Sequence, residues 1–290
     1  MKLQDSILPN YFSYISETWH PYPIYPYNFV NRNSKTLVIT IGDSWTFGAD
    51  IYPDDFKYKQ ERLNKIYGNI IASELTADFL SLGQSGTCNL YIISKIIELD
   101  KIIPTLEYEK IIIICTFTEA CRSIDGYFDK TNDYVSWFNN QHFDSIDKFN
   151  SIIEYHNSLY QDTLVNLIKK YSHVELIVGT NFVEPVGMHK EISVLPKSWT
   201  QVYSEKIIKQ EYTGECFIMS HWIFDKLPDI ITKFKPSIDQ QLLKQWMIDL
   251  INIALERKKL VSDHRYFRGI SHPLASGHRV WANYILENLK

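Results

Sequence analysis

The chain has 290 residues and a formal net charge of −4, with acidic and basic residues interspersed along it. No basic stretch favours a nucleic-acid partner, and no apolar run reaches the roughly 18 residues of a membrane-spanning helix. The first residues also lack the apolar core of a signal peptide, so we expect a cytoplasmic protein. Its length predicts one domain, residues 1–290, with a single large core.

Residues 1–35 combine prolines with many aromatic side chains, among them Trp19, Tyr22, Tyr25 and Phe29. Alternating proline and tyrosine is incompatible with a regular helix and favours an extended strap over the body of the protein. Aromatic rings of this kind can also line a carbohydrate site. We expect the strap to act mainly in packing.

Apolar runs along the chain predict the strands of one sheet. They lie at residues 36–41, 78–82, 111–115 and 174–178. The run Ile111 to Cys115 has no polar alternation, which is typical of a strand covered on both faces. Helical spacing of apolar residues occurs at 63–75, 92–97, 149–168, 238–255 and 276–289. The alternation predicts an α/β three-layer sandwich with a central, mainly parallel sheet, in which 120–146 and 180–235 are insertions.

Three polar turns follow the expected strands, where ligands bind in open α/β sheets. They are Gly42-Asp43-Ser44, Gly83 to Asn89, and Thr116 to Glu119. His272 lies near the C-terminus, just before the last expected helix. A serine needs a positioned base to attack a carbonyl carbon at neutral pH, and Ser44 with His272 supplies the minimal pair. The glycines allow backbone N–H groups to approach a developing oxyanion.

These segments resemble the sequence blocks of the SGNH, or GDSL-like, hydrolases. Ile41 to Gly48 is similar to the first block, Gly83-Gln84-Ser85-Gly86 to the second, and His272-Pro273 followed by Gly277-His278 to the fifth. The resemblance implies a flavodoxin-like sandwich in which Ser44 is the nucleophile and His272 the general base. It also implies that the N–H groups of Ser44 and Gly86 form the oxyanion hole, and that His278 belongs to the last helix.

The third block of that family ends in an asparagine that donates to the oxyanion, and here the position is Thr118. The Thr118 hydroxyl can donate one hydrogen bond, or Asn89 can supply an amide from the second turn. Loss of such a donor costs about 3 kcal/mol in catalysis, which slows an enzyme of this kind without removing its chemistry.

The family also places an aspartate three residues before the histidine, where this chain has Gly269. Two alternatives can orient the imidazole of His272. Asp263 is the nearest carboxylate in the same loop, and a backbone carbonyl acting on a Ser44–His272 dyad is the other.

The resemblance implies an esterase that removes a short O-acyl group from a carbohydrate or another small ester, without a cofactor. No histidine or cysteine spacing predicts a metal site. Arg122, Trp45, Tyr127 and Trp137 are candidate substrate contacts. Two other functions fit the same residues. One is an acyltransferase that uses the Ser/His site, and the other is a non-catalytic binding module that retains the fold.

Several candidate residues also have purely structural interpretations. Asp43 is a natural turn or cap residue, and Ser44 can itself cap the next helix. His278 is more often structural than catalytic, and Arg122 can pair with Glu119 instead of a substrate.

Overall fold

The computed structural model describes residues 3, 28–49, 51, 59–84, 87, 89–118, 146–181, 188–199, 201–202, 273 and 275–289. The strands are β1 (Asn28–Val30), β2 (Thr36–Gly42), β3 (Asp78–Gly83), β4 (Lys110–Phe117), β5 (Val174–Thr180) and β6 (Ser193–Val194). The helices are α1 (Ser44–Phe47), α2 (Lys59–Leu63), α3 (Tyr67–Glu74), α4 (Asn89–Ile102), the 3₁₀ turn η2 (Ile103–Thr105), α6 (Ile146–Lys170) and α10 (Ala275–Asn288).

The six strands form one sheet in the order β1-β3-β2-β4-β5-β6. β2 to β6 run parallel to one another, and β1 pairs antiparallel with β3 at the edge. If the five parallel strands alone are numbered along the chain, with β2 as the first, their order in the sheet is 2-1-3-4-5. This is the flavodoxin-like arrangement. Its topological switch point lies between β2 and β4, so a ligand is expected at the carboxyl ends of these two strands.

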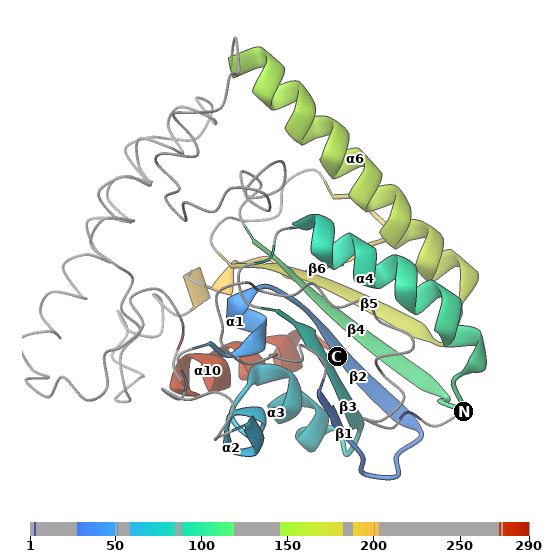
Figure 1. The fold of residues 1–290 in the computed structure, drawn as a ribbon, viewed down its shortest axis with the longest axis vertical. Coiled ribbons are helices and arrows are strands. Elements are labelled where there is room, and N and C mark those ends of the chain that lie inside the picture. Colours follow the sequence, from blue (N-terminus) through green and yellow to red (C-terminus); the bar gives the residue numbers. More distant parts are fainter. Residues whose placement is uncertain are drawn as a thin grey trace, which may run out of the picture.

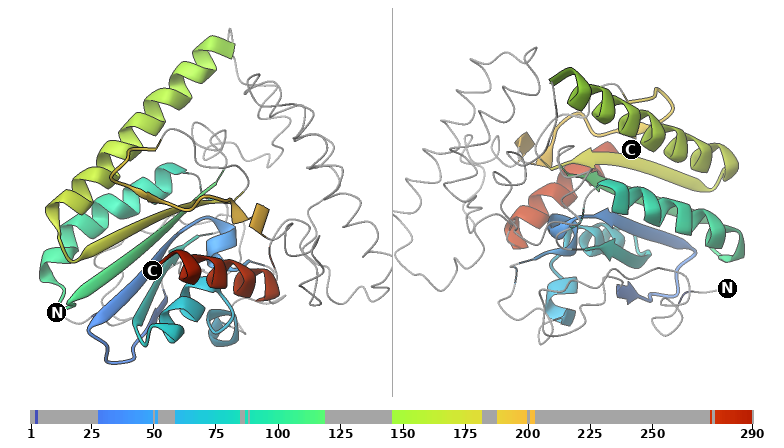
Figure 2. Two further views of the ribbon diagram at one scale, coloured as in Figure 1. Left: turned by 180° about the vertical axis from the view of Figure 1, so that it is seen from behind. Right: turned by 45° about the horizontal axis from the view of Figure 1, so that its top comes forward.

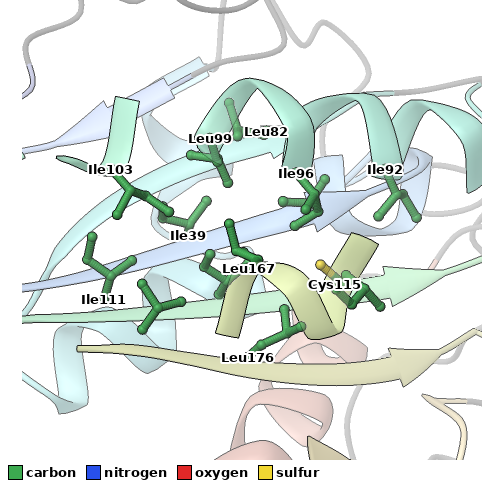
Figure 3. Close-up of a cluster of buried hydrophobic side chains, with 14 of the residues drawn as sticks. Ile39, Leu82, Ile92, Ile96, Leu99, Ile103, Ile111, Cys115, Leu167 and Leu176 are labelled. Atoms are coloured by element: carbon green, nitrogen blue, oxygen red, sulfur yellow. The ribbon is translucent and has the colours of Figure 1, made fainter. Parts of the chain in front are cut away.

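Helices cover both faces of the sheet, as the prediction of a three-layer α/β sandwich requires. Figures 1 and 2 show α4 and α6 on one face and α3 with α10 on the other. Side chains from α4, α6 and the sheet form one core cluster, which includes Ile39, Ile96 and Leu167 (Figure 3). A second cluster lies under α3 and α10 and includes Val38 and Trp281. A sheet buried on both faces explains the unbroken apolar run of β4.

The four strands predicted from apolar runs are all present, each extended by one or more residues. The single helix expected at 63–75 is wrong, because the chain forms α2 and α3 instead. The break occurs at Ile66, whose backbone is extended (φ −74°, ψ 145°) while its side chain is buried in the core. Core packing therefore overrides the helical periodicity at this point.

Two short strands come from segments that the sequence left without regular structure. β1 lies in the expected 1–35 strap, and β6 lies in the expected 180–235 insertion. β6 extends the sheet by pairing with β5 at Ile177 and Val178. Most of the expected insertion 120–146, and the helix expected at 238–255, lie outside the described residues.

A polar network closes the amino end of β3. The buried carboxylate of Asp78 accepts hydrogen bonds from the backbone N–H groups of Arg32 (2.6 Å) and Ser34 (3.2 Å). The Tyr108 hydroxyl donates to the same carboxylate at 2.9 Å. The Arg32 guanidinium donates to the carbonyl of Ala77 and to the side chain of Asn69. We call Asp78 and these partners the amino-edge network.

Candidate active site

The site is organised by one row of residues that crosses four strands. The register pairs Gly83 with Gly42, Gly42 with Thr116, and Thr116 with Gly179. Ser44, Thr118 and Asn181 each follow their row member by two positions, so they leave the sheet at the same level. Because β2 and β4 flank the switch point, Ser44 and Thr118 come from the two strand ends where the fold favours a ligand.

Ser44 begins α1, a single turn of helix at the carboxyl end of β2 (Figure 1). Asp43 is the N-cap, and its carboxylate accepts from the N–H of Trp45 at 3.0 Å. This confirms the cap interpretation of Asp43, and the interpretation of Ser44 as the cap is wrong. Gly48 ends the helix at φ +79°, a left-handed conformation that favours glycine. Ser44 is only 3% exposed.

Two glycines allow α1 to rest directly on the sheet backbone. A Cβ atom at Gly83 would lie 2.7 Å from the backbone nitrogen of Phe47 and 2.9 Å from the carbonyl carbon of Thr46. A Cβ atom at Gly42 would overlap the side chain of Thr46. The absence of side chains at Gly42 and Gly83 therefore sets the depth at which the Ser44 turn sits.

Thr118 and Asn89 lie together at the end of β4. The N–H of Thr118 donates to Asn89 Oδ1 at 2.9 Å, and Asn89 Nδ2 donates back to the Thr118 carbonyl at 3.1 Å. Both residues are buried. The two alternative oxyanion donors are thus bonded to each other, in a clamp that joins the start of α4 to the segment after β4.

Asn181 is a site residue that the sequence interpretation missed. Its side-chain nitrogen lies 3.1 Å from each carboxylate oxygen of Asp43, and its N–H donates to the carbonyl of Phe117 at 3.0 Å. The side chain is fully buried. The only signal in the sequence is a polar residue that follows a buried strand, as Ser44 and Thr118 also do.

Tyr67 supports α1 from the side of α3. Its hydroxyl lies 2.9 Å from Thr116 Oγ1 and 3.3 Å from Thr46 Oγ1, so one phenol joins α3, β4 and α1. Burial raises the pKa of Tyr67, which therefore stays neutral. Its N–H donates to Nδ1 of His278 at 3.2 Å, and the two rings stack. His278 lies in α10 as expected, and these contacts give it a structural role.

Trp45 and Trp199 connect α1 to the last helix. Trp45 is 2% exposed and meets the Trp199 ring edge to face, with centroids 5.4 Å apart, so its indole is part of the core. Trp199 Nε1 donates to the carbonyl of Gly277 in the first turn of α10. The Trp199 side chain therefore lies between α1 and the first turn of α10.

The other predicted site residues lie outside the described residues. They are Gly86, Arg122, Tyr127, Trp137, Asp263 and His272. Within the described part of the chain, no three His, Cys, Asp or Glu side chains gather as metal ligands would. No helix among the described segments has the length and apolarity needed to cross a membrane.

Comparison with known proteins finds no matching family model and no matching curated protein. Among solved structures, the chain is similar to a lipolytic G-D-S-L family protein from Veillonella parvula DSM 2008. That pair is 15% identical with a TM-score of 0.35, and the match covers 87% of this chain and 97% of the other.

A second G-D-S-L family protein, from Desulfitobacterium hafniense DCB-2, is 14% identical with a TM-score of 0.30. Here the match covers 57% of this chain and 78% of the other. The fold assignment rests on the order and direction of the strands in the sheet.

Proposed function

We propose that the protein is a serine hydrolase of the SGNH type that cleaves an ester through an acyl-enzyme. The observation that carries the proposal is the position of Ser44. It lies on a tight, glycine-supported turn at the switch point of a flavodoxin-like sheet, beside the strand end that carries Thr118. A strand that ends at this point delivers a side chain to the ligand crevice of the fold.

In this proposal Ser44 Oγ attacks the ester carbonyl carbon while His272 accepts the hydroxyl proton. The tetrahedral intermediate collapses, and His272 returns the proton to the departing alcohol. Water, activated by the same imidazole, then attacks the acyl-enzyme and releases the acid. Asp263 or a backbone carbonyl orients His272, because the usual aspartate position is Gly269.

The oxyanion would be held by the N–H groups of Ser44 and Gly86 and by the hydroxyl of Thr118. The hydrogen-bond pattern supports different roles for the two polar candidates. Asn89 uses both its oxygen and its nitrogen on the backbone of Thr118, so its proposed role is to fix that residue in place.

Fluorophosphonate labelling tests the proposal, because the reagent reacts with an activated serine. The wild-type protein should gain one adduct, mapped by mass spectrometry to the peptide that contains Ser44, and Ser44→Ala should gain none. If the folded wild-type protein stays unlabelled, the chain is a non-catalytic module. The resemblance favours a short O-acyl group on a carbohydrate as substrate, so acetylated sugars are the first esters to assay.

An acyltransferase is the second candidate, favoured by the burial of Ser44. A nucleophile that is 3% exposed is sheltered from water, as acyl transfer to a sugar hydroxyl requires. Turnover of p-nitrophenyl acetate with and without an oligosaccharide acceptor separates the two functions. A hydrolase releases acetate in both cases, whereas a transferase accumulates acetylated sugar and speeds up when the acceptor is added.

A further inference from the structure

Asp43 and Asn181 connect two strands that are not neighbours in the sheet. β4 lies between β2 and β5, yet the Asn181 side chain reaches both carboxylate oxygens of Asp43 at 3.1 Å. Asp43 Oδ1 also accepts the N–H of Trp45, which fixes the first turn of α1. The residue that precedes the nucleophile is therefore anchored on the end of β5 as well as on its own helix.

Asn181 is itself held by the backbone. Its N–H donates to the carbonyl of Phe117, the residue immediately before Thr118. Asn181 thus connects the Ser44 turn to the segment that contains Thr118, the proposed oxyanion donor. A small displacement of catalytic groups of about 1 Å can cost on the order of 100-fold in rate, so a link between these two segments bears directly on catalysis.

We propose that Asn181 is a positioning residue for the reaction. It acts through Asp43, and it fixes the positions of the Ser44 hydroxyl and N–H relative to Thr118. The inference rests on the proposed function, since it assumes that Ser44 is the nucleophile. It goes beyond that function by assigning a role to a residue at the end of β5, outside the proposed nucleophile, base and oxyanion donors.

Asn181→Ala removes the link and should lower kcat on p-nitrophenyl acetate by on the order of 10- to 100-fold, with KM nearly unchanged. Rates are expressed per folded molecule, with the folded fraction taken from thermal unfolding. Asn69→Ala is the matched control. Asn69 is also a buried asparagine, but its side chain bonds to Arg32 and to the carbonyl of Leu63, away from the strand-end turns. Its kcat per folded molecule should stay at the wild-type value.

Asn181→Asp gives a readout that a merely structural residue would not produce. Two carboxyl groups about 3 Å apart share one proton, and the introduced carboxyl group, while protonated, would donate to Asp43 as the asparagine does. When that proton is lost at higher pH, repulsion separates the pair. The ratio of Asn181→Asp to wild-type kcat should therefore be near one on the acid side and fall as pH rises.

The double variant Asp43→Asn with Asn181→Asp exchanges the carboxylate and the amide across the same contact. Asparagine is also a good N-cap, so the Trp45 N–H keeps its acceptor. The double variant should recover at least about half of the wild-type kcat at the pH where Asn181→Asp is impaired. Such a recovery identifies the pair itself, because two independent structural losses would add.

The outcomes separate the two proposals. If wild-type Ser44 takes up no fluorophosphonate, the proposed function fails and the positioning role fails with it. If the wild type is labelled and active while Asn181→Ala keeps the wild-type kcat, only the positioning role is overturned. A pH-independent ratio for Asn181→Asp, or a double variant no better than the single one, overturns it as well, even where Asn181→Ala does not fold.

Discussion

The same hydrogen-bond arrangement occurs at the amino ends of the strands, the amino edge, and at their carboxyl ends, the carboxyl edge. Its role differs between the two. Each has a buried aspartate whose carboxylate accepts from a backbone N–H and from a neutral side-chain donor: Asp43 from Trp45 and Asn181, and Asp78 from Arg32 and Tyr108. At the amino edge the network closes the start of a strand. At the carboxyl edge the aspartate is followed at once by Ser44, on the switch point of the fold.

This difference shows that hydrogen bonding alone does not identify a site. What distinguishes the carboxyl edge is its position in the topology and the two glycines beneath α1, Gly42 and Gly83, which allow the helix to approach the sheet backbone closely. The comparison predicts that substitutions at the carboxyl edge change the rate for each folded molecule. Substitutions in the amino-edge network should change only the free energy of unfolding.

Ser44→Ala should give the largest effect. Loss of the proposed nucleophile is expected to lower kcat by at least about 10⁴-fold, as the loss of the catalytic serine does in well-studied serine hydrolases. The free energy of unfolding should stay within about 1 kcal/mol of wild type, because the alanine keeps the helix and removes one hydroxyl. Esterase assays and denaturant unfolding measure the two quantities. A variant that keeps about a tenth of the activity would remove Ser44 from the mechanism.

Gly83→Ala tests the support beneath the nucleophile. The added methyl group would press on the backbone of Thr46 and Phe47, so α1 must shift away from the sheet. We expect a loss of about 1–3 kcal/mol in unfolding free energy, and a kcat for each folded molecule that falls on the order of 100-fold. Unchanged kcat in a folded Gly83→Ala protein would mean that the depth of α1 does not matter to the chemistry.

Asp78→Ala tests the opposite edge. It leaves the N–H groups of Arg32 and Ser34 and the Tyr108 hydroxyl without this acceptor inside the protein, which should cost about 3 kcal/mol of stability. The kcat of the remaining folded molecules should equal that of wild type. Thermal unfolding and an active-site titration give both numbers, and a fall in kcat at full folding would break the division between the edges.

The Tyr108→Phe substitution should have a smaller effect on the unfolding free energy, and this effect should depend on pH. Burial and the hydrogen bond to Asp78 raise the pKa of Tyr108 above its ordinary value. The folded state therefore holds this proton more tightly than the unfolded state, so the contribution is complete below about pH 10 and declines as pH rises beyond it. Above about pH 10, the unfolding free energy of the wild type should fall with each pH unit by up to about 1.4 kcal/mol more than that of the variant. Denaturation measured from about pH 8 to pH 11 tests this, and an equal pH dependence of the two proteins would contradict it.

Much of the fold follows from local patterns. The buried strands appear in the sequence as apolar runs, and the polar turns after them mark the sheet edge where Ser44 and Thr118 lie. The break at Ile66 could not be predicted in this way, because the apolar residues around it are spaced as in one continuous helix. Its extended backbone is set by the packing of its side chain in the core. β6 has only two residues, which is too short to produce a periodic signal.

A residue of the candidate site could be predicted where it belongs to a local sequence pattern, and it could not be predicted where its contact partner is distant in the sequence. Ser44 stands in a recognisable sequence block, and Thr118 is a polar residue that directly follows a long apolar strand. Asn181 is a single polar residue 138 positions away from Asp43, and only the sheet order brings them together. Tyr67 looks like one more apolar position of a helix, and its hydrogen bonds to Thr46 and Thr116 depend on the packing of α3 against the sheet.

The proposed mechanism passes through a covalent acyl intermediate on Ser44. It is tested most directly by stopping the reaction with p-nitrophenyl acetate in acid during turnover and measuring the mass of the peptide that contains Ser44. We expect one acetyl group on Ser44 in the wild-type protein, which appears together with a burst of p-nitrophenolate, and neither the acetyl group nor the burst in Ser44→Ala. Ester turnover without an acyl group on Ser44, or an equal burst from Ser44→Ala, would contradict it.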